Sequence, residues 1–508
     1  MMTGSSAVPK SHSLLAAAAI AAVVLFASNL PAADQPNIVI ILADDLGWGS
    51  LGCYGADPKL VRTPHCDRLA REGRRFTDAN TPSSVCSPTR YGLLTGRYCW
   101  RTQLKHWVLF YDAPLHIETD RLNLASLLKR QGYATAAIGK WHLGYGALKA
   151  NYTQPLRPGP LDIGFDYHFA VPSNHGDLTG IYVENDRVFG LRSEKLVKLT
   201  ERTYLGTEYL GLDAPLRVDD QVMPTLSDRA VAWLEQQDPN KPFFLYYTPV
   251  AVHNPATPSA KVKGSSRAGN FGDWIQELDA AVGRVLDVLD RKKLTDNTLV
   301  IFTSDNGGAR TDNSAKERQE DTARADEGYV REGLKVNGPF RGGKHSIFEG
   351  GFRVPFLVRW PGKVPPGTVC DETIGLVDLL ATVAAVVGQK LPSADSAAED
   401  SYNVLPAFLG KPHKSPLRPH LIVHSDEGNF AIRQGAWKYI EGKPHEAVQR
   451  GDHPAPSPQV RAAEFKPQLY NLASDPGEKQ NLLEQRPDVA KRLADLLAKY
   501  RAQKHSRL

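Results

Sequence analysis

Cys86, Pro88 and Arg90 lie at a spacing that allows chemistry beyond that of an ordinary thiol. They form a C-x-P-x-R run, with Ser87 and Thr89 between them. In such a context a cysteine can be oxidised after translation to an aldehyde, formylglycine, which water hydrates to a geminal diol. Because proline fits the first turn of a helix, we expect Cys86 near a helix N-terminus, where the dipole favours negative charge. Arg90, one turn further on, would then hold the diol and screen nearby carboxylates.

Two apolar runs of the sequence are followed by hard oxygen donors, which are Asp44, Asp45, Asp305 and Asn306. Carboxylate and amide oxygens suit Ca²⁺ or Mg²⁺ better than zinc. Carboxylates crowded into one place repel one another unless a cation neutralises them. Either pair alone is equally typical of an ordinary turn. Together with the C-x-P-x-R run, the two pairs predict a site for a divalent cation.

Lysines and histidines supply the remaining candidate groups. Lys140 and His142 are separated by one residue, so in an extended segment they share one face and can reach the same site. His253 follows another apolar run, and Lys344 lies among glycines. Each has an ordinary alternative, because an isolated histidine is often a packed ring and a lysine between glycines is often solvated.

The elements that must position these groups alternate between strands and helices. Apolar runs rich in β-branched or aromatic residues predict buried strands at 38–42, 135–138, 243–247 and 299–302. Helical spacing and helix-end signals predict helices at about 63–73, 122–132 and 275–289. This alternation predicts an α/β fold with a large, open, mostly parallel sheet flanked by helices. In such sheets ligands bind beyond the carboxyl ends of the strands, where the candidate residues collect.

The pattern of the sequence changes after about residue 375. Prolines and small residues interrupt segments 392–406 and 411–419, and short strand-like runs follow at 421–424, 430–433 and 437–440. A helix is expected at about 488–501. We therefore predict a catalytic α/β domain over residues 34–375 and a smaller C-terminal α+β domain over residues 376–508.

These motifs resemble those of a known family. Residues 84–96, which include the C-x-P-x-R run, resemble the first sulfatase signature, and residues 132–142 resemble the second. Segments 469–472 and 475–478 are similar to the C-terminal turn of sulfatases, so the resemblance spans nearly the whole chain after the N-terminal segment. It is a resemblance to the formylglycine-dependent type I sulfatases of the alkaline-phosphatase superfamily. The pattern is most similar to the branch of arylsulfatase A and N-acetylgalactosamine-6-sulfatase.

The resemblance implies that Cys86 becomes formylglycine and that its diol, stabilised by Arg90, attacks sulfur. It also implies a bound cation, Ca²⁺ with Mg²⁺ as the alternative, held by Asp44, Asp45, Cys86, Asp305 and Asn306. The implied partner is a formylglycine-generating enzyme or an anaerobic sulfatase-maturating enzyme.

The resemblance further implies roles for the lysines and histidines. Lys140 and Lys344 would bind the sulfate and neutralise its charge. His142 would hydrogen-bond the diol and act as the base that regenerates the aldehyde, and His253 would be the acid for the leaving group. Relatives often carry a richer histidine run at the place of His253, where this chain has one histidine. His175 lies where relatives contact substrate, with a plain loop histidine as the alternative.

The first residues of the chain predict export. Lys10 precedes an apolar stretch at 14–26, and small residues at 31–33 precede Asp34, which is the layout of a signal peptide over residues 1–33. The stretch is short for a membrane span, although an uncleaved anchor is the alternative. No other segment of the sequence has the length and hydrophobicity to span a bilayer, so we expect a periplasmic or secreted protein with no stable membrane span.

The composition agrees with a globular enzyme. The chain has 508 residues, 42% hydrophobic and 23% charged, enough for a large core. A net charge of +5 gives no indication that nucleic acid is a partner. The five cysteines match no zinc module in their spacing, and their odd number agrees with one being consumed.

The implied activity is hydrolysis of sulfate monoesters, either aryl sulfates or sulfated sugars such as galactose- or N-acetylgalactosamine-6-sulfate. A phosphonate or phosphate diester hydrolase of the same superfamily is the enzymatic alternative, because phosphoryl and sulfuryl groups have similar shapes. An exported protein that binds sulfated glycans without turnover is the alternative from another class. The loops at 100–101, 182–187 and 310–338 are expected to decide the substrate.

Overall fold

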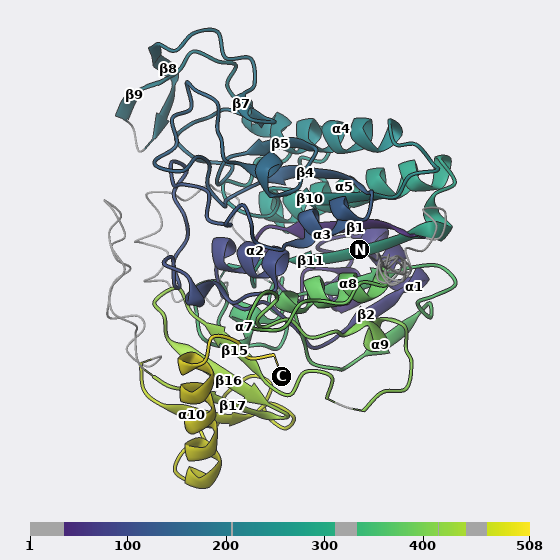
Figure 1. Cartoon of the computed structure of the whole chain (residues 1–508), viewed down its shortest axis with the longest axis vertical. Coiled ribbons are helices and arrows are strands. Elements are labelled where there is room, and N and C mark those ends of the chain that lie inside the picture. Colours follow the sequence, from purple (N-terminus) through teal and green to yellow (C-terminus); the bar gives the residue numbers. More distant parts are fainter. Residues whose placement is uncertain (1–34, 205–206, 310–332, 415, 443–464, 508) are drawn as a thin grey trace, which may run out of the picture.

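A ten-stranded sheet forms the centre of the molecule (Figure 1). The computed structural model describes residues 35–204, 207–309, 333–414, 416–442 and 465–507. The strand order is β13-β2-β12-β11-β1-β10-β4-β5-β6-β7. These strands are β1 (Asn37–Ala43), β2 (Arg74–Phe76), β4 (Ala134–Lys140), β5 (Tyr167–Val171), β6 (Val183–Glu184), β7 (Arg187–Val188), β10 (Phe243–Thr248), β11 (Thr298–Ser304), β12 (Phe356–Arg359) and β13 (Thr368–Cys370). Two small sheets pair β3 (Ala79–Asn80) with β14 (Ile374–Gly375) and β8 (Leu196–Tyr204) with β9 (Thr207–Leu212).

The strands predicted from the sequence lie side by side in the middle of this sheet. β1 pairs in parallel with β11 and with β10, and β10 pairs in parallel with β4. Ile38 and Ile40 of β1 pack into one hydrophobic cluster, whereas Val39 and Ile41 pack into another. A strand buried on both faces needs a continuous apolar sequence, as parallel sheets usually show. The predicted α/β fold with a large, mostly parallel sheet is confirmed.

Helices cover both faces of the sheet (Figure 1). On the face of Val39 lie α1 (Pro64–Glu72), α4 (Val222–Glu235) and α5 (Gly269–Arg291). On the face of Ile38 lie α2 (Cys86–Thr95), α3 (Leu124–Arg130), α8 (Leu379–Val386) and α9 (Leu405–Phe408). The helices expected at 63–73, 122–132 and 275–289 correspond to α1, α3 and α5. Because β1, β4, β10 and β11 run in parallel, their carboxyl ends meet at one edge of the sheet.

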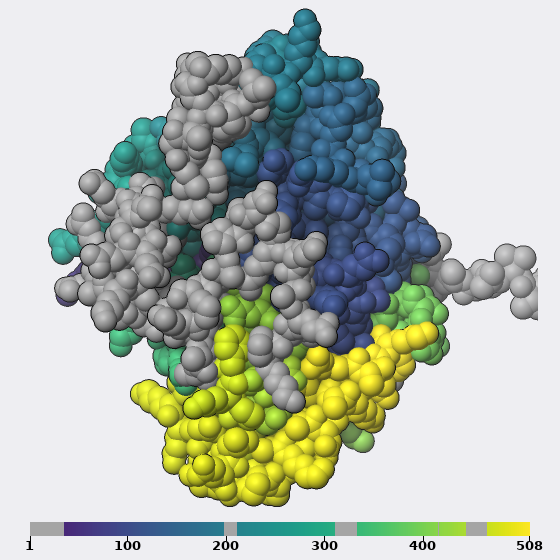
Figure 2. Space-filling model, turned by 90° about the vertical axis from the view of Figure 1, so that its left-hand side faces the viewer, coloured from purple at the N-terminus to yellow at the C-terminus, as the bar shows by residue number. Residues whose placement is uncertain are grey.

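A separate antiparallel sheet lies near the C-terminus. It consists of β15 (Leu421–His424), β16 (Phe430–Gln434), β17 (Trp437–Ile440) and β18 (Gln468–Asn471), with α10 (Pro487–Ala502) packed against it. Figure 2 shows this unit, mostly in yellow, below the larger one. Because α8 and α9 contribute to the core of the large sheet, we propose that the second domain begins near β15 rather than at residue 376.

None of the helices in the described parts of the chain is both long and apolar enough to cross a membrane. The predicted signal peptide at 1–33 lies outside the described residues, as does most of the loop predicted at 310–338.

Candidate active site

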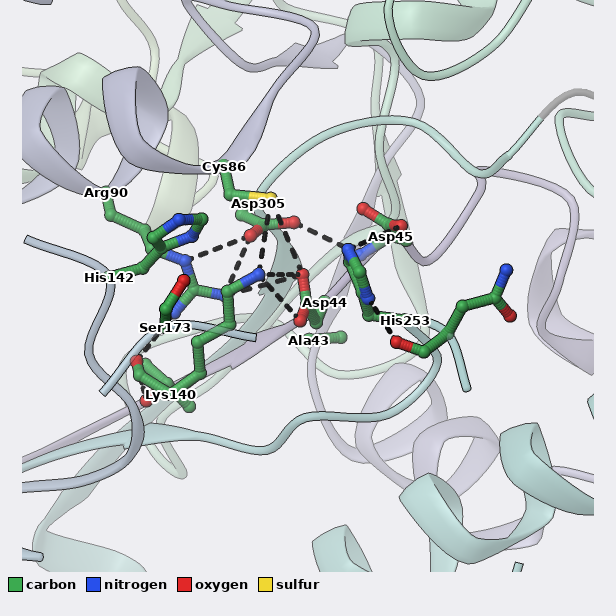
Figure 3. A network of polar contacts seen from close by, with 12 residues as sticks. Ala43, Asp44, Asp45, Cys86, Arg90, Lys140, His142, Ser173, His253 and Asp305 are labelled. Carbon is green, nitrogen blue, oxygen red and sulfur yellow. Dashed lines mark hydrogen bonds and ion pairs between the residues drawn. The ribbon is translucent and has the colours of Figure 1, made fainter. Parts of the chain in front are cut away.

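Cys86 is the first residue of α2 and has only 2% of its surface exposed. The residue before it, Val85, has an extended backbone, so the helix begins at the cysteine. The Sγ atom lies 3.3 Å from Nζ of Lys140 and 3.8 Å from Oδ1 of Asp44 (Figure 3). Burial raises the pKa of the Cys86 thiol to about 12. An unmodified Cys86 is therefore un-ionised near neutral pH and a weak nucleophile.

One turn further along α2, Arg90 binds Asp305 at the end of β11. Its Nε and Nη2 donate to Oδ2 of Asp305 at 3.0 and 2.7 Å, and its Nη1 donates to the carbonyl of Lys140 at 2.9 Å. Both charged groups of the Arg90–Asp305 pair are fully buried. Burial opposes the charge, but Asp305 and Asp44 raise the pKa of Arg90 above its usual value. Arg90 therefore stays charged and screens the carboxylates directly.

The predicted metal ligands come together at the ends of β1 and β11. Ligand atoms lie within 4.8 Å of one another in Asp44, Asp45, Cys86 and Asp305. Burial raises the pKa of Asp44 to about 7 despite Lys140, and Asp305 and Asp45 add to the rise. Asn306 donates through Nδ2 to Asp45 at 2.8 Å, while its buried Oδ1 has no hydrogen-bond partner among the described residues. Crowded carboxylates beside an unsatisfied amide oxygen fit a hard divalent cation.

Lys140 and His142 reach the site from the end of β4. The Lys140 ammonium donates to both carboxylate oxygens of Asp44 at 2.9 Å. His142 has a φ of +55°, so the segment is not extended there, contrary to the expectation from sequence. Its Nε2–H donates to the carbonyl of Leu109 at 2.8 Å, which leaves Nδ1 as an acceptor in the neutral ring.

The surroundings of His142 favour the neutral ring. Burial, with Lys140 and Arg90 nearby, holds the pKa of His142 well below its usual value. Its Nδ1 is buried and has no hydrogen-bond partner in the part of the chain that is described. Figure 3 shows the ring beside Arg90. His142 is thus suited to accept a hydrogen bond or a proton inside the site.

Lys344 and His253 approach the cluster at Asp45. The Lys344 Nζ lies 2.7 Å from Oδ2 of Asp45, and the His253 Nε2 lies 3.8 Å from the same oxygen. The His253 Nδ1–H donates to the carbonyl of Asn254 at 2.7 Å. Burial opposes ionisation of Asp45, but Lys344 and His253 hold its pKa below the usual range. We call the assembled group the Cys86 cluster; it consists of Asp44, Asp45, Cys86, Arg90, Lys140, His142, His253, Asp305, Asn306 and Lys344.

His175 is a buried residue that contacts Thr257 and Arg217. It is fully buried, its Nε2 lies 2.7 Å from Oγ1 of Thr257, and its carbonyl accepts from Nη2 of Arg217 at 2.9 Å. Its ring packs near that of Trp274. A role for His175 in binding substrate stays a prediction.

The segment that carries Lys344 is anchored by residues that the sequence analysis did not assign to the site. Lys438 of β17 donates to the carbonyl of Ile347 at 2.9 Å and pairs with Glu349 at 3.1 Å and with Glu478 at 2.8 Å. Glu478 also accepts from the backbone N–H of Glu349 at 2.6 Å. Glu478 is the last residue of the Asp-Pro-Gly-Glu segment at 475–478. This motif was therefore the feature of the sequence that could have indicated the anchoring contacts.

The loop at 100–101 does not join the Cys86 cluster. Trp100 and Arg101 line a cavity of about 500 Å³ next to α10, together with Phe430 and Arg501. Arg101 is held there by two hydrogen bonds of 2.8 Å to Asp400. The residues that line this cavity include no member of the Cys86 cluster.

The chain matches the family model described as Sulfatase over residues 36–389. It is 35% identical over 497 residues to an N-acetylgalactosamine-6-O-sulfatase of Bacteroides thetaiotaomicron, with 91% of this chain and 93% of the relative covered. It is 36% identical to arylsulfatase A of Bos taurus, with 91% and 86% covered. A solved structure from a glycosaminoglycan-metabolism locus of Bacteroides thetaiotaomicron superposes with a TM-score of 0.79 at 33% identity, covering 92% of this chain and all of that one. A phosphonate monoester hydrolase of Agrobacterium radiobacter shares the fold, with a TM-score of 0.56 at 18% identity over 92% of this chain and 96% of its own.

Proposed function

Because the chain belongs to the sulfatase family and is a sulfuric ester hydrolase, we propose that it removes 6-O-sulfate groups from galactose or N-acetylgalactosamine in sulfated glycans. The match to an N-acetylgalactosamine-6-O-sulfatase supports this choice, because it covers 91% of this chain and 93% of that enzyme. The similarity to arylsulfatase A supports small aryl sulfates as a second class of substrate.

We further propose that Cys86 is converted to formylglycine, which supplies a geminal diol as nucleophile. The raised pKa of the thiol, about 12, supports the conversion, because an un-ionised thiol is a weak nucleophile. Only 2% of Cys86 is exposed, so the enzyme that makes formylglycine has to act before this part of the chain folds. Secretion through the signal peptide at 1–33 belongs to the same proposal, and N-terminal sequencing of the exported protein tests it.

The residues of the Cys86 cluster then have separate roles in the reaction. Lys140 and Lys344 hold the sulfate oxygens from two sides and neutralise their charge. Arg90 fixes the group at position 86 and screens the carboxylates around it. His142 accepts a proton at Nδ1, and His253 faces the leaving group with Nε2. The negative charge of a bound sulfate ester favours the protonated, proton-donating form of His253.

A divalent cation, which we propose to be Ca²⁺, would supply positive charge beside the nucleophile. The residues that would hold it are Asp44, Asp45, Asp305, Asn306 and the group at position 86.

The observation that carries this function is the pair of ammonium groups around the cysteine. Lys140 lies 2.9 Å from Asp44 and Lys344 lies 2.7 Å from Asp45, and these two carboxylates are adjacent in the chain. Two cations close to one nucleophile suit a tetrahedral group with several anionic oxygens.

Initial rates on three substrates test the proposal. We expect turnover of N-acetylgalactosamine 6-sulfate and of 4-nitrophenyl sulfate, and a much slower reaction with an aryl phosphonate monoester. A faster phosphonate reaction would identify a phosphonate hydrolase. If protein with formylglycine at position 86 binds sulfated glycans but hydrolyses neither these glycans nor any of the three substrates, the non-catalytic alternative is correct.

A further inference from the structure

The residue after Lys344 adopts a strained backbone conformation. His345 has a φ of +75°, in the left-handed region that favours glycine. Its backbone N–H donates to the carbonyl of Ser84 at 3.0 Å, two residues before Cys86. The N–H of Lys344 donates to the carbonyl of Gly308 at 2.9 Å. Strain of this kind persists where surrounding contacts enforce it, and it concentrates at binding sites.

The imidazole of His345 is oriented by a buried carboxylate. Its Nδ1 lies 3.0 Å from Oδ2 of Asp426, in the β15–β16 turn of the C-terminal sheet. The Asp426 side chain is fully buried, whereas 39% of the His345 side chain is exposed. Because a carboxylate accepts, Nδ1 carries the proton and Nε2 is the acceptor in the neutral ring. That Nε2 has no hydrogen-bond partner within the described ranges of the chain.

A third segment connects this histidine with the Cys86 cluster. His106 donates from Nδ1 to the carbonyl of Asp426 at 2.6 Å, and the ring of Trp107 lies 6.5 Å from that of His345 at an interplanar angle of 29°. Two residues further on, the carbonyl of Leu109 holds His142. We call His345, Asp426 and Trp107 the outer trio.

The place of the alcohol part of a sulfate ester follows from the direction of attack. A group attacking sulfur from position 86 expels the alcohol on the far side of the sulfur, because attack and departure are in line. His345 is the next residue after Lys344, which binds the sulfate in the proposed function. Part of the His345 side chain is exposed. The residues bordering the sulfate on its outer side are therefore the ones that meet the leaving group.

The chemistry of the outer trio suits a sugar better than a plain aromatic ring. An oriented imidazole nitrogen accepts a hydrogen bond from a ring hydroxyl, and an indole beside it packs against the C–H face of a pyranose. Resting on the proposed function, we propose that His345, positioned by Asp426 and flanked by Trp107, forms the subsite that accepts a hydroxyl hydrogen bond from the sugar carrying the sulfate. Nitrophenyl leaving groups lack such hydroxyls and gain nothing from this hydrogen bond.

Replacing His345 by glycine tests whether its imidazole binds the sugar, because a loss of structure would lower the rates on both substrates alike. His345→Gly removes the imidazole and suits the positive φ, which offsets part of the loss of the hydrogen bond to the buried Asp426. The rates are measured below the melting temperature of the variant, where it is folded. We expect the ratio of kcat/KM on N-acetylgalactosamine 6-sulfate to kcat/KM on 4-nitrophenyl sulfate to fall about tenfold or more. Lys293→Gly is the matched control, because Lys293 also has a positive φ, +57°, in the turn after α5. Lys293→Gly should leave this ratio as it is.

An unchanged ratio for His345→Gly, or equal losses on both substrates, would overturn the subsite. The substrate proposal fails separately if the wild type leaves the 6-sulfated sugar intact. In that case the same ratio is measured with the sulfated monosaccharide that the wild type does hydrolyse. A wild type that hydrolyses aryl sulfate but no sulfated sugar overturns both proposals.

Discussion

The ammonium of Lys438 lies 2.9 Å from the carbonyl of Ile347, three residues after Lys344. This contact ties the C-terminal sheet to the segment that presents Lys344 to the site. Lys438 also neutralises two buried carboxylates, Glu349 and Glu478. Lys438→Met leaves both without this cation, so the free energy of unfolding should fall by about 3 kcal/mol, measured by chemical denaturation. Displacing Lys344 should also lower kcat/KM of the folded variant by about tenfold or more.

A double-mutant cycle shows whether Lys438 acts through Lys344. If it does, Lys438→Met adds little to the loss caused by Lys344→Ala, whereas independent effects would multiply. Arg418→Met is the matched control, because Arg418 pairs with Asp378 at 2.6 Å and both side chains are fully buried. We expect the control to lose stability but to keep its kcat/KM while folded. Multiplying effects in the cycle would refute the positioning role of Lys438.

Cys86→Ala should abolish turnover while the protein stays folded. The polar contacts of Sγ are long, 3.3 Å and 3.8 Å, so its removal should cost only about 1 kcal/mol of stability. Activity and melting temperature are the measurements. Cys99→Ala is the matched control, because Cys99 is equally buried, at 1% exposed, but lies outside the Cys86 cluster. Turnover by Cys86→Ala at the wild-type rate would rule out position 86 as the nucleophile.

Removing divalent cations should inactivate and destabilise the protein. The ligand atoms of Asp44, Asp45 and Asp305 lie within 4.8 Å, so without a cation their mutual repulsion opposes folding. Incubation with a chelator should lower the melting temperature and the rate, and added Ca²⁺ should restore both. Asn306→Leu should weaken the apparent cation affinity by at least about tenfold. Full activity after exhaustive chelation would contradict a catalytic cation.

Stability should decrease in mild acid because of buried neutral histidines. Burial lowers the pKa of His168 to about 3, and its Nε2 lies 2.9 Å from the hydroxyl of Tyr145. Between about pH 6.5 and 3 the unfolded chain binds a proton at His168 that the folded chain does not. The free energy of unfolding therefore decreases as the pH is lowered, by up to about 1.4 kcal/mol per pH unit for this residue. His168→Gln should make the slope shallower in urea denaturation between pH 7 and 5; identical slopes would contradict the assignment.

The centre of the sheet was predictable because its signals are local. A strand buried on both faces needs an uninterrupted apolar run, which 38–42 and 299–302 show directly. The short strands at the margins of the sheet were not predictable from the sequence. β2 is the three-residue strand Arg74–Phe76, and its two arginines give it no apolar run that would predict a strand. β12 pairs antiparallel to β11, unlike the parallel strands at the centre. Such short elements form because their neighbours complete the pairing, which no local pattern records.

The candidate site likewise contains residues that were predictable from the sequence and residues that were not. Asp44, Cys86 and Lys140 each belong to a short motif, so their residue types and spacing pointed to the site before its geometry was known. The contacts of Lys438 with Glu349 and of His345 with Asp426 join residues far apart in the chain, and they depend on how the C-terminal sheet packs. Sequence patterns indicate which side chains carry chemistry, whereas packing decides which ones hold them in place.

The most direct test of the central claim is the mass of the peptide that contains position 86 in catalytically active protein. We expect the mass of formylglycine in place of cysteine, with an occupancy that rises in proportion to the specific activity across preparations. Fully active protein that carries only an unmodified thiol at Cys86 would contradict the claim.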